Sequence, residues 1–299
     1  MRKIFWIFCT ALLLTANSYA EIKPIEEIFE PDATLYPVDK FGKVAVIQWA
    51  PPGYAPLTQD EAIAESWKQR NRERIASYID DAANNGAKMV LAPEFSTVGY
   101  PDIPELSEED DNFTKPEEIA PYAEPIPGKT TDYFSKIAKK YSIYLHIGMA
   151  EENKISKSKT VFHNTVVVIG PDGEIVAKYS KMHLYQNESD YLVPGKDITI
   201  YNNKYFGRVG LVICSDVYGS HPMDNYAREK IDVLALSTSW AQYNTGWSYF
   251  TRGAQWVNAY LLAANQNYFP DSGVIEPSGK AQSHIRQTTG VAYGYLPLK

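Results

Sequence analysis

Three polar side chains that could share one reaction each follow a buried, apolar stretch of the sequence. Glu94 ends the run MVLAPE, Lys181 ends IVAKYSK and Cys214 ends GLVIC. Taken singly, they have ordinary interpretations as a surface acid, a solvated base and a small core residue. Taken together, they are a base, a cation and a nucleophile, the groups that nucleophilic catalysis uses.

The apolar runs around these residues predict strands that alternate with helices. Catalytic groups in α/β proteins gather at the carboxyl ends of strands, because the sheet positions them and the loops admit substrate. Near-continuous apolar runs also indicate strands that are covered on both faces, so the predicted class is α/β with helices outside the sheet layers. The pattern leaves one sheet or two stacked sheets open. The expected strands are 43–50, 88–94, 143–150, 208–214 and 232–239, and the expected helices are 58–86, 130–141, 225–230 and 247–258.

The N-terminus has the pattern of a secretory signal peptide over residues 1–20. Basic residues precede the apolar run IFWIFCTALLLT, and small residues then lead to a predicted cleavage after Ala20. The alternative is a membrane anchor, but the apolar core is shorter than the roughly 20 residues that span a bilayer. We therefore expect an exported chain, periplasmic or secreted, with no stable membrane anchor.

Export would change the interpretation of the two cysteines. The sequence has two, Cys9 and Cys214, and Cys9 leaves with the signal peptide. One thiol then remains in an oxidising compartment without an internal partner, which indicates a reactive residue or an intermolecular bridge. A buried, inert cysteine accounts for the same fact equally well.

The rest of the chain divides into an arm and a folded region. Residues 21–40 are acidic and contain proline, and we interpret them as an N-terminal arm before a domain at 41–299. The remaining length suits one large α/β domain or two small ones. The formal net charge is -7 and no block is rich in lysine or arginine, so nucleic acid is not an expected partner.

Three segments resemble motifs of a known superfamily. LAPEFSTVGYP is similar to the glutamate motif of the nitrilase (carbon–nitrogen hydrolase) superfamily, AKYSKMHLY to its lysine motif, and GRVGLVICSDVYGSHP to its cysteine motif. They occur in the family's order and at its usual spacings. Within the superfamily the sequence resembles most the vanin (pantetheinase) and biotinidase branch, through HLY, QNESDY, STSWAQ and AANQNYFPDSGVIEPSG.

The resemblance implies a fold and a reaction. The fold is an αββα sandwich of two stacked sheets flanked by helices, usually paired with a second subunit as a homodimer or higher oligomer. The reaction is hydrolysis of a non-peptide C–N bond through a thioester on Cys214. Because a thiol with a pKa of about 8.5 is mostly protonated at neutral pH, Glu94 would take its proton. Lys181 and the backbone N–H of Ser215 would stabilise the oxyanion.

The resemblance also assigns supporting residues. Glu188 matches the family's second glutamate, which orients the lysine and the substrate; a loop carboxylate is the alternative. Tyr100, Tyr185 and Trp240 match pocket-wall positions, although ordinary packing explains them nearly as well. Asp216 would brace the turn after the nucleophile.

One departure concerns the residues after the cysteine. Many relatives that recognise a carboxylate carry an arginine there, whereas this chain has SDVYGSH, so an acidic substrate tail has no evident partner.

The expected substrate is a small linear amide, for which the resemblance suggests the pantetheine or biotin-amide type, and no cofactor is expected. The five histidines show no HExxH-type spacing, so no catalytic metal is predicted either. Three alternatives stay open. They are a catalytically silent binding protein on the same scaffold, an N-acyltransferase, and a redox protein that uses one reactive thiol.

Overall fold

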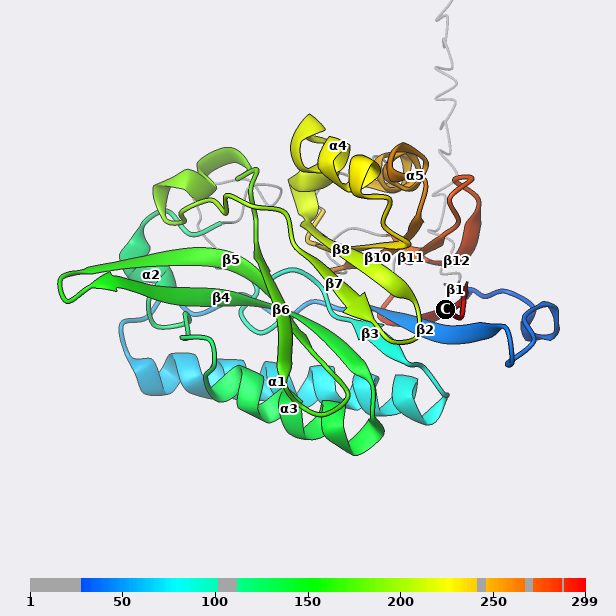
Figure 1. The fold of residues 1–299 in the computed structure, drawn as a ribbon. Helices are drawn as coiled ribbons and strands as arrows, with labels where there is room; N and C mark the ends of the chain where they lie inside the picture. Colours follow the sequence, from blue (N-terminus) through cyan, green and yellow to red (C-terminus); the bar gives the residue numbers. More distant parts are fainter. Residues whose placement is uncertain (1–27, 102–111, 241–245, 267–270, 287) are drawn as a thin grey trace, which may run out of the picture.

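The computed structural model describes residues 28–101, 112–240, 246–266, 271–286 and 288–299 of the 299-residue chain. Within these residues the chain forms two stacked β-sheets with helices packed on both outer faces, as Figure 1 shows. The predicted α/β class and αββα sandwich are confirmed, and the choice between one sheet and two is settled in favour of two. The predicted signal peptide lies outside the described residues.

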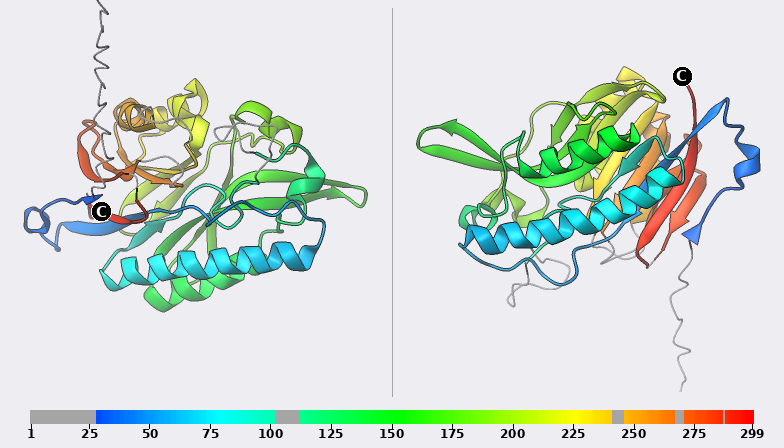
Figure 2. Two further views of the ribbon diagram at one scale, coloured as in Figure 1. Left: turned by 180° about the vertical axis from the view of Figure 1, so that it is seen from behind. Right: turned by 90° about the horizontal axis from the view of Figure 1, so that it is seen from below.

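One sheet has six strands in the order β13-β2-β3-β4-β5-β6. The three strands β2, β3 and β4 run parallel, and the outer pairings are antiparallel. The hairpin of β4 and β5 extends beyond the rest of the sheet in Figures 1 and 2. The bounds are β2 Phe41–Gln48, β3 Met89–Leu91, β4 Tyr144–Ser156, β5 Lys159–Ile169, β6 Ile175–Ser180 and β13 Gly290–Pro297.

The other sheet has seven strands in the order β1-β12-β11-β10-β9-β8-β7. Its centre, β8 to β10, is parallel. Ile28 and Phe29 form the edge strand β1 by pairing with β12, so the end of the predicted arm is attached to this sheet. The bounds are β1 Ile28–Phe29, β7 Ile200–Asn203, β8 Gly207–Ile213, β9 Val233–Thr238, β10 Tyr260–Asn265, β11 Ser272–Ile275 and β12 Ala281–Ile285.

Two pairs of helices cover the outer faces of the sheets. Helices α1 and α3 lie side by side on the six-stranded sheet, and α4 and α5 lie on the seven-stranded sheet (Figures 1 and 2). The helices are α1 Glu61–Asn84, α2 Pro116–Ile119, α3 Lys129–Tyr141, α4 Ser220–Glu229 and α5 Gly246–Val257, and the 3₁₀ helices are η1 Ala33–Leu35, η2 Gln186–Asp190 and η3 Cys214–Tyr218.

The strand β2 shows why the apolar runs are nearly continuous. Val44 and Val46 belong to the core between the two sheets, whereas Ala45 and Ile47 pack under the helices α1 and α3. Successive side chains of a strand point to opposite faces of the sheet. Since both faces of this part of the strand are buried, the four positions from Val44 to Ile47 are all apolar.

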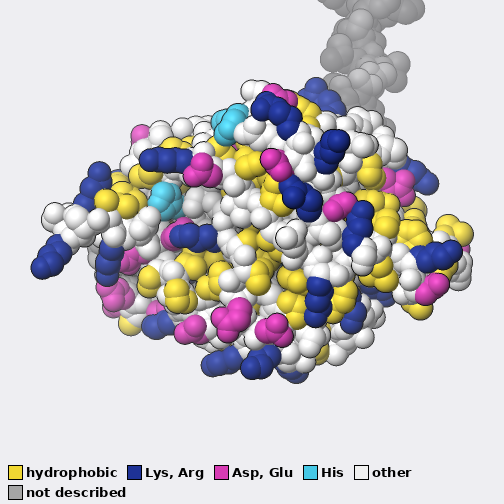
Figure 3. Space-filling model, in the orientation of Figure 1, with side chains coloured by type: hydrophobic (Ala, Val, Ile, Leu, Met, Phe, Trp, Pro, Cys, Tyr) yellow, Lys and Arg dark blue, Asp and Glu magenta, His cyan; other side chains and the backbone are white. Residues whose placement is uncertain are grey.

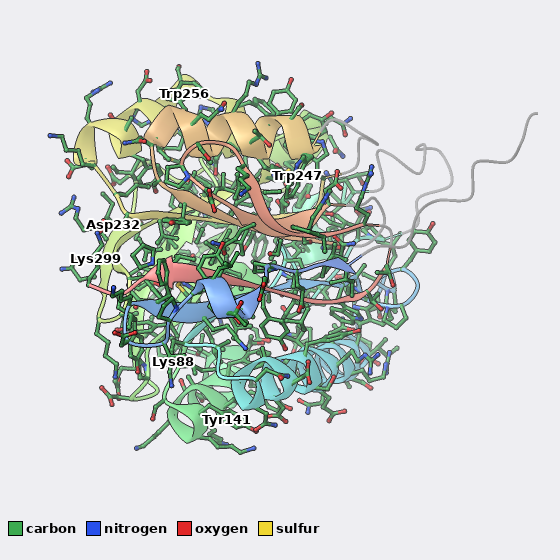
Figure 4. All side chains as sticks on the ribbon, turned by 90° about the vertical axis from the view of Figure 1, so that its right-hand side faces the viewer. Lys88, Tyr141, Asp232, Trp247, Trp256 and Lys299 are labelled. Atoms are coloured by element: carbon green, nitrogen blue, oxygen red, sulfur yellow. The ribbon has the colours of Figure 1, made fainter. Side chains whose placement is uncertain are left out.

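The layers are visible edge-on in Figure 4. Trp256 of α5 and Tyr141 of α3 mark the two outer helix layers, and Asp232 and Lys299 lie between them at the level of the sheets. On the face drawn in Figure 3, acidic and basic side chains are interspersed. Among the described helices, none combines the length and the apolar character that crossing a bilayer requires.

Candidate active site

The three chemical residues follow strands of both sheets. Glu94 comes shortly after β3 and Lys181 directly after β6 of the six-stranded sheet, and Cys214 directly after β8 of the seven-stranded sheet. The hydroxyl of Ser237 donates a hydrogen bond across the layers to the carbonyl oxygen of Ala92, at 2.9 Å. Stacking of the sheets therefore brings these strand ends together.

Two carboxylates share one ammonium group in the buried centre of the site. Lys181 Nζ lies 3.0 Å from Glu94 Oε1 and 2.9 Å from Glu188 Oε1. The exposed fractions are 1% for Glu94, 2% for Lys181 and 2% for Glu188. Buried charges are costly unless they are paired, so the three side chains hold one another in place.

The arrangement of two carboxylates around one ammonium group shifts the pKa values of these side chains. Burial opposes the charge on Lys181, but the carboxylates of Glu188 and Glu94 outweigh it and raise the lysine pKa well above its usual range. Burial raises the pKa of Glu188, and Lys181 offsets this only in part because Glu94 raises it further. Lys181 is therefore a fixed cation at neutral pH.

Further hydrogen bonds orient Glu94. Asn164 Nδ2 donates to Oε1 at 2.6 Å, the backbone N–H of Ser239 donates to Oε2 at 2.8 Å, and Gln266 Nε2 donates to the Glu94 carbonyl at 2.7 Å. Sequence reasoning did not single out these residues. A signal for Asn164 was present, since it is an amide inside the apolar strand TVFHNTVVVIG.

Several residues of the site carry polar side-chain atoms without a partner. Within the described residues, Asn164 Oδ1, Thr238 Oγ1 and Gln266 Oε1 are buried without a hydrogen-bond partner. Buried polar atoms normally have partners, so such a cluster is typical of a site that binds a polar ligand.

Cys214 is a buried free thiol on a strained turn. It is 9% exposed, opens η3, and has a φ of 45°. Phe95 and Gln186, in the other two segments of the site, also have positive φ angles, of 43° and 46°. Non-glycine residues rarely adopt this left-handed conformation, and such strain concentrates at functional sites.

The thiol is protonated at neutral pH. Burial, followed by the negative charge of Glu94, raises the pKa of Cys214 to about 12, although Lys181 acts in the opposite direction. These mutual effects place the thiol within electrostatic reach of both charged groups. Attack by this sulfur therefore needs a base that removes the proton during the reaction.

Asp216 braces the nucleophile turn against the lysine loop. Its carboxylate accepts hydrogen bonds from the backbone N–H groups of Ile213, at 3.1 Å, and His183, at 2.8 Å. Since Ile213 precedes Cys214 and His183 follows Lys181 closely, the buried carboxylate fixes the two segments relative to each other.

The remaining expected residues also lie around this centre. Ser215 is buried in η3, and its hydroxyl donates to the carbonyl oxygen of His183. The Tyr185 N–H donates to Glu188 Oε2 at 2.6 Å.

Burial, then the charges of Glu94 and Glu188, raise the pKa of Tyr100 well above its usual range. The buried ring of Trp240 packs against Tyr218, with ring centres 5.8 Å apart. Tyr218 was not among the sequence candidates.

Among the described residues, no three histidine, cysteine or acidic side chains are grouped to hold a metal ion.

Comparisons with known proteins agree with the motifs. The family described as Carbon-nitrogen hydrolase matches residues 43–299. The human protein named omega-amidase NIT2 is 30% identical over 257 residues, which cover 78% of this chain and 85% of that protein. A probable nitrilase of Schizosaccharomyces pombe is 27% identical and covers 71% of this chain and 76% of its own length.

Solved structures show the same fold. The Saccharomyces cerevisiae Nit3 crystal structure, described as branch 10 of the nitrilase superfamily, has a TM-score of 0.69 at 21% identity and covers 86% of this chain and 90% of its own. An amidase from Nesterenkonia sp. has a TM-score of 0.65 at 19% identity, covering 89% and 94%. The family match over nearly the whole described chain decides the classification: this protein belongs to the carbon–nitrogen hydrolase family of the nitrilase superfamily and is a carbon–nitrogen hydrolase, as its three motifs predicted.

Proposed function

We propose that this hydrolase is an amidase that cleaves a small linear amide through a thioester on Cys214. The observation that carries the proposal is the buried ion pair of Glu94 and Lys181, at 3.0 Å, within electrostatic reach of the thiol. A base and a fixed cation beside a neutral thiol are what attack on an amide carbonyl requires.

The first half of the reaction acylates the cysteine. As the Cys214 sulfur attacks the carbonyl carbon, Glu94 takes the thiol proton, which is needed because the pKa of the thiol is raised to about 12. The carbonyl oxygen becomes an oxyanion, which Lys181 and the Ser215 N–H stabilise. The N–H groups in the first turn of a helix have no partner within that helix, so the Ser215 donor suits this role.

The second half releases the acid. Glu94 gives its proton to the departing nitrogen as the C–N bond breaks, and then takes a proton from the water that attacks the thioester. The C–S bond breaks as the acid forms, and Glu94 returns the proton to the Cys214 sulfur. Glu188 keeps Lys181 in position through its own contact of 2.8 Å. Tyr100, Tyr185 and Trp240 form the walls around the reacting carbonyl.

The substrate class that we propose is narrower than the range of C–N bonds that the family as a whole hydrolyses. The name of the human relative, omega-amidase, favours an amide at the end of the substrate. The vanin and biotinidase resemblance instead favours pantetheine and biocytin. All of these are linear amides, so a panel that contains them separates the branches.

Ammonia or amine release from this panel tests the proposal. We expect no turnover by Cys214→Ala, and a fall in kcat of about 10²–10⁴ for Glu94→Gln. The matched control is Glu124→Gln, another buried glutamate that contacts a lysine, Lys68, at 2.9 Å, and it should keep the wild-type rate.

Mass spectrometry of the enzyme mixed with substrate gives an independent readout. An acyl adduct on the Cys214 peptide supports a thioester and contradicts a redox role for the thiol. Turnover that survives Cys214→Ala would refute the mechanism. Failure to hydrolyse any amide or nitrile would favour the silent binding scaffold, and transfer of the acyl group to an added amine in preference to water would favour an N-acyltransferase.

We also propose that the protein is exported, with a mature N-terminus at Glu21, and that it forms a homodimer or a higher oligomer. The basic start and the apolar run of residues 1–20 support export. N-terminal sequencing of the protein from intact cells and light scattering of the purified protein test these two points. An intact Met1 or a monomeric mass would contradict them.

A further inference from the structure

Among the described residues, the charged groups next to the thiol are paired with one another. The ammonium of Lys181 already contacts both Glu94 and Glu188. Asp216 adds a buried carboxylate, and the nearby His183 contacts it through Nδ1 at 3.2 Å. The described charged groups of the site are therefore paired, with negative charge in excess.

An aromatic wall stands beside this negative centre. We define it as Tyr218, Trp240 and Tyr249. Their ring centres are 5.8 Å apart for Tyr218 and Trp240, 5.3 Å for Tyr218 and Tyr249, and 5.2 Å for Trp240 and Tyr249. Phe250 supports Trp240 from behind at 5.6 Å, and Tyr218 is 41% exposed. The accessible part of the wall is thus Tyr218, whereas the guanidinium of Arg252 lies over Tyr249, 4.8 Å from the ring centre.

The aromatic wall is next to the nucleophile. Tyr218 is the last residue of η3, the short helix that begins with Cys214. Burial, and then the charge at Cys214, raise the pKa of Tyr218 to about 12. A group attached to the reacting carbonyl would therefore meet the Tyr218 ring and the surplus negative charge on this side of the thiol.

We infer that the site selects amides whose group next to the carbonyl is uncharged and apolar or aromatic, and that it rejects a carboxylate there. This inference rests on the amidase function proposed above. Aromatic faces bind apolar groups well, and a buried like charge is strongly disfavoured. These contacts therefore favour linear amides without a charged group next to the carbonyl over amides that carry a carboxylate there.

A matched set of primary amides tests the inference. The set is 3-phenylpropanamide, hexanamide and glutaric monoamide, which have similar lengths and differ in charge and aromaticity. We expect kcat/KM for the two neutral amides to exceed that of the anionic amide by at least about tenfold, or about 1.4 kcal/mol. Equal or higher kcat/KM for glutaric monoamide would overturn the inference while leaving the amidase function intact. No turnover of any amide, with no adduct on Cys214, would instead overturn the proposed function.

A charge introduced into the aromatic wall provides a second test of the inference. Tyr218→Arg should raise the kcat/KM ratio of anionic to neutral amide by about tenfold or more, because it places a cation beside the carboxylate. Tyr218→Phe should keep the wild-type ratio, since the ring remains. Ile155→Arg, in β4 next to the turn into β5, where the side chain is 57% exposed, adds the same charge outside the aromatic wall and should also keep it. An unchanged ratio in Tyr218→Arg would remove Tyr218 from the substrate pocket.

A separate observation concerns Thr238, the last residue of β9. Ile213 pairs with Ser237 in the parallel ladder, so Thr238 is next in register to Cys214. Its side chain is fully buried, and Oγ1 has no hydrogen-bond partner among the described residues. The hydroxyl is also close enough to the sulfur to lower the pKa of the thiol.

We propose that the Thr238 hydroxyl donates a hydrogen bond to the Cys214 sulfur as negative charge develops there during attack. A donor to a charged group commonly contributes a factor of about ten to a hundred. We therefore expect Thr238→Val to lower kcat by that factor with KM unchanged, and to slow iodoacetamide alkylation of Cys214 at pH 8.

The conservative variant separates chemistry from packing. Thr238→Ser keeps the donor and should restore both rates to near the wild-type values. The isosteric Thr238→Val should keep the wild-type free energy of unfolding, because it removes a buried hydroxyl that had no partner. Wild-type kcat and alkylation in Thr238→Val, or rates equally low in Thr238→Ser, would overturn the proposal.

Discussion

Removing the positive charge of Lys181 tests the buried charge cluster directly. Its side chain is 2% exposed and is the ammonium that Glu94 and Glu188 share. Lys181→Met keeps most of the apolar stem but leaves two buried carboxylates without a cation between them. One carboxylate must then be protonated in the folded state, because two adjacent buried carboxylates cannot both stay ionised cheaply.

The free energy of this proton uptake determines how much stability the substitution removes. A glutamate in the unfolded chain has a pKa of about 4.3, so keeping it protonated on folding costs about 3.7 kcal/mol at pH 7 and about 1 kcal/mol at pH 5. The folded pKa is raised, so the loss of stability grows as pH rises above the unfolded pKa. We expect the free energy of unfolding to fall by about 3–4 kcal/mol at pH 7, which matches the usual cost of breaking a buried ion pair.

Urea denaturation followed by tryptophan fluorescence between pH 5 and pH 8 measures this effect. The double variant Lys181→Met/Glu188→Gln should regain most of the stability lost at pH 7, since only one buried carboxylate remains. Lys154→Met, whose exposed ion pair with Glu152 lies on the protruding hairpin, is the control and should change stability by less than about 0.5 kcal/mol. A loss in Lys181→Met that is the same at pH 5 and pH 7 would refute the reasoning.

Acid should weaken the core at His146, because burial lowers the pKa of this histidine to about 3. The unfolded chain binds the proton first, near pH 6.5, so about 2 kcal/mol of stability should disappear between pH 7.5 and pH 5, and urea denaturation of His146→Gln should lack that loss. Cys214→Gly should be more stable to urea than Cys214→Ala by about 1 kcal/mol, because glycine accepts the φ of 45°; the reverse order would contradict strain at this residue. Asp216→Asn should lower the free energy of unfolding by about 2 kcal/mol, because an amide cannot accept at both positions that bind Ile213 and His183; a melting temperature equal to that of the wild type would contradict this role.

The chemical residues could be recognised in the sequence because each follows a strand that local pattern identifies. Glu94, Lys181 and Cys214 end apolar runs, and the motifs around them are specific enough to indicate the family. The class of fold was predictable for the same reason, since near-continuous apolar strands separated by helices require cover on both faces. The local pattern did not indicate the short strand β7, whose residues Ile200–Asn203 include two polar asparagines.

The partners that hold the three candidate catalytic residues were not predictable from local sequence. Asn164 binds Glu94 across 70 residues of chain, and Gln266 binds it across 172. Such contacts depend on how the two sheets stack and on strand register, which the periodicity of one strand does not determine.

The sequence by itself determined most of the order of strands and helices, the family and the three candidate catalytic residues, because these depend on local patterns. Only the tertiary structure decided that one ammonium serves two carboxylates, that Cys214 occupies a left-handed turn, and that aromatic rings flank it. The physical reason is that pairing, burial and backbone strain are properties of segments packed together. The energies of these interactions can therefore be assessed only from the tertiary structure, in which the stacked sheets bring those segments into contact.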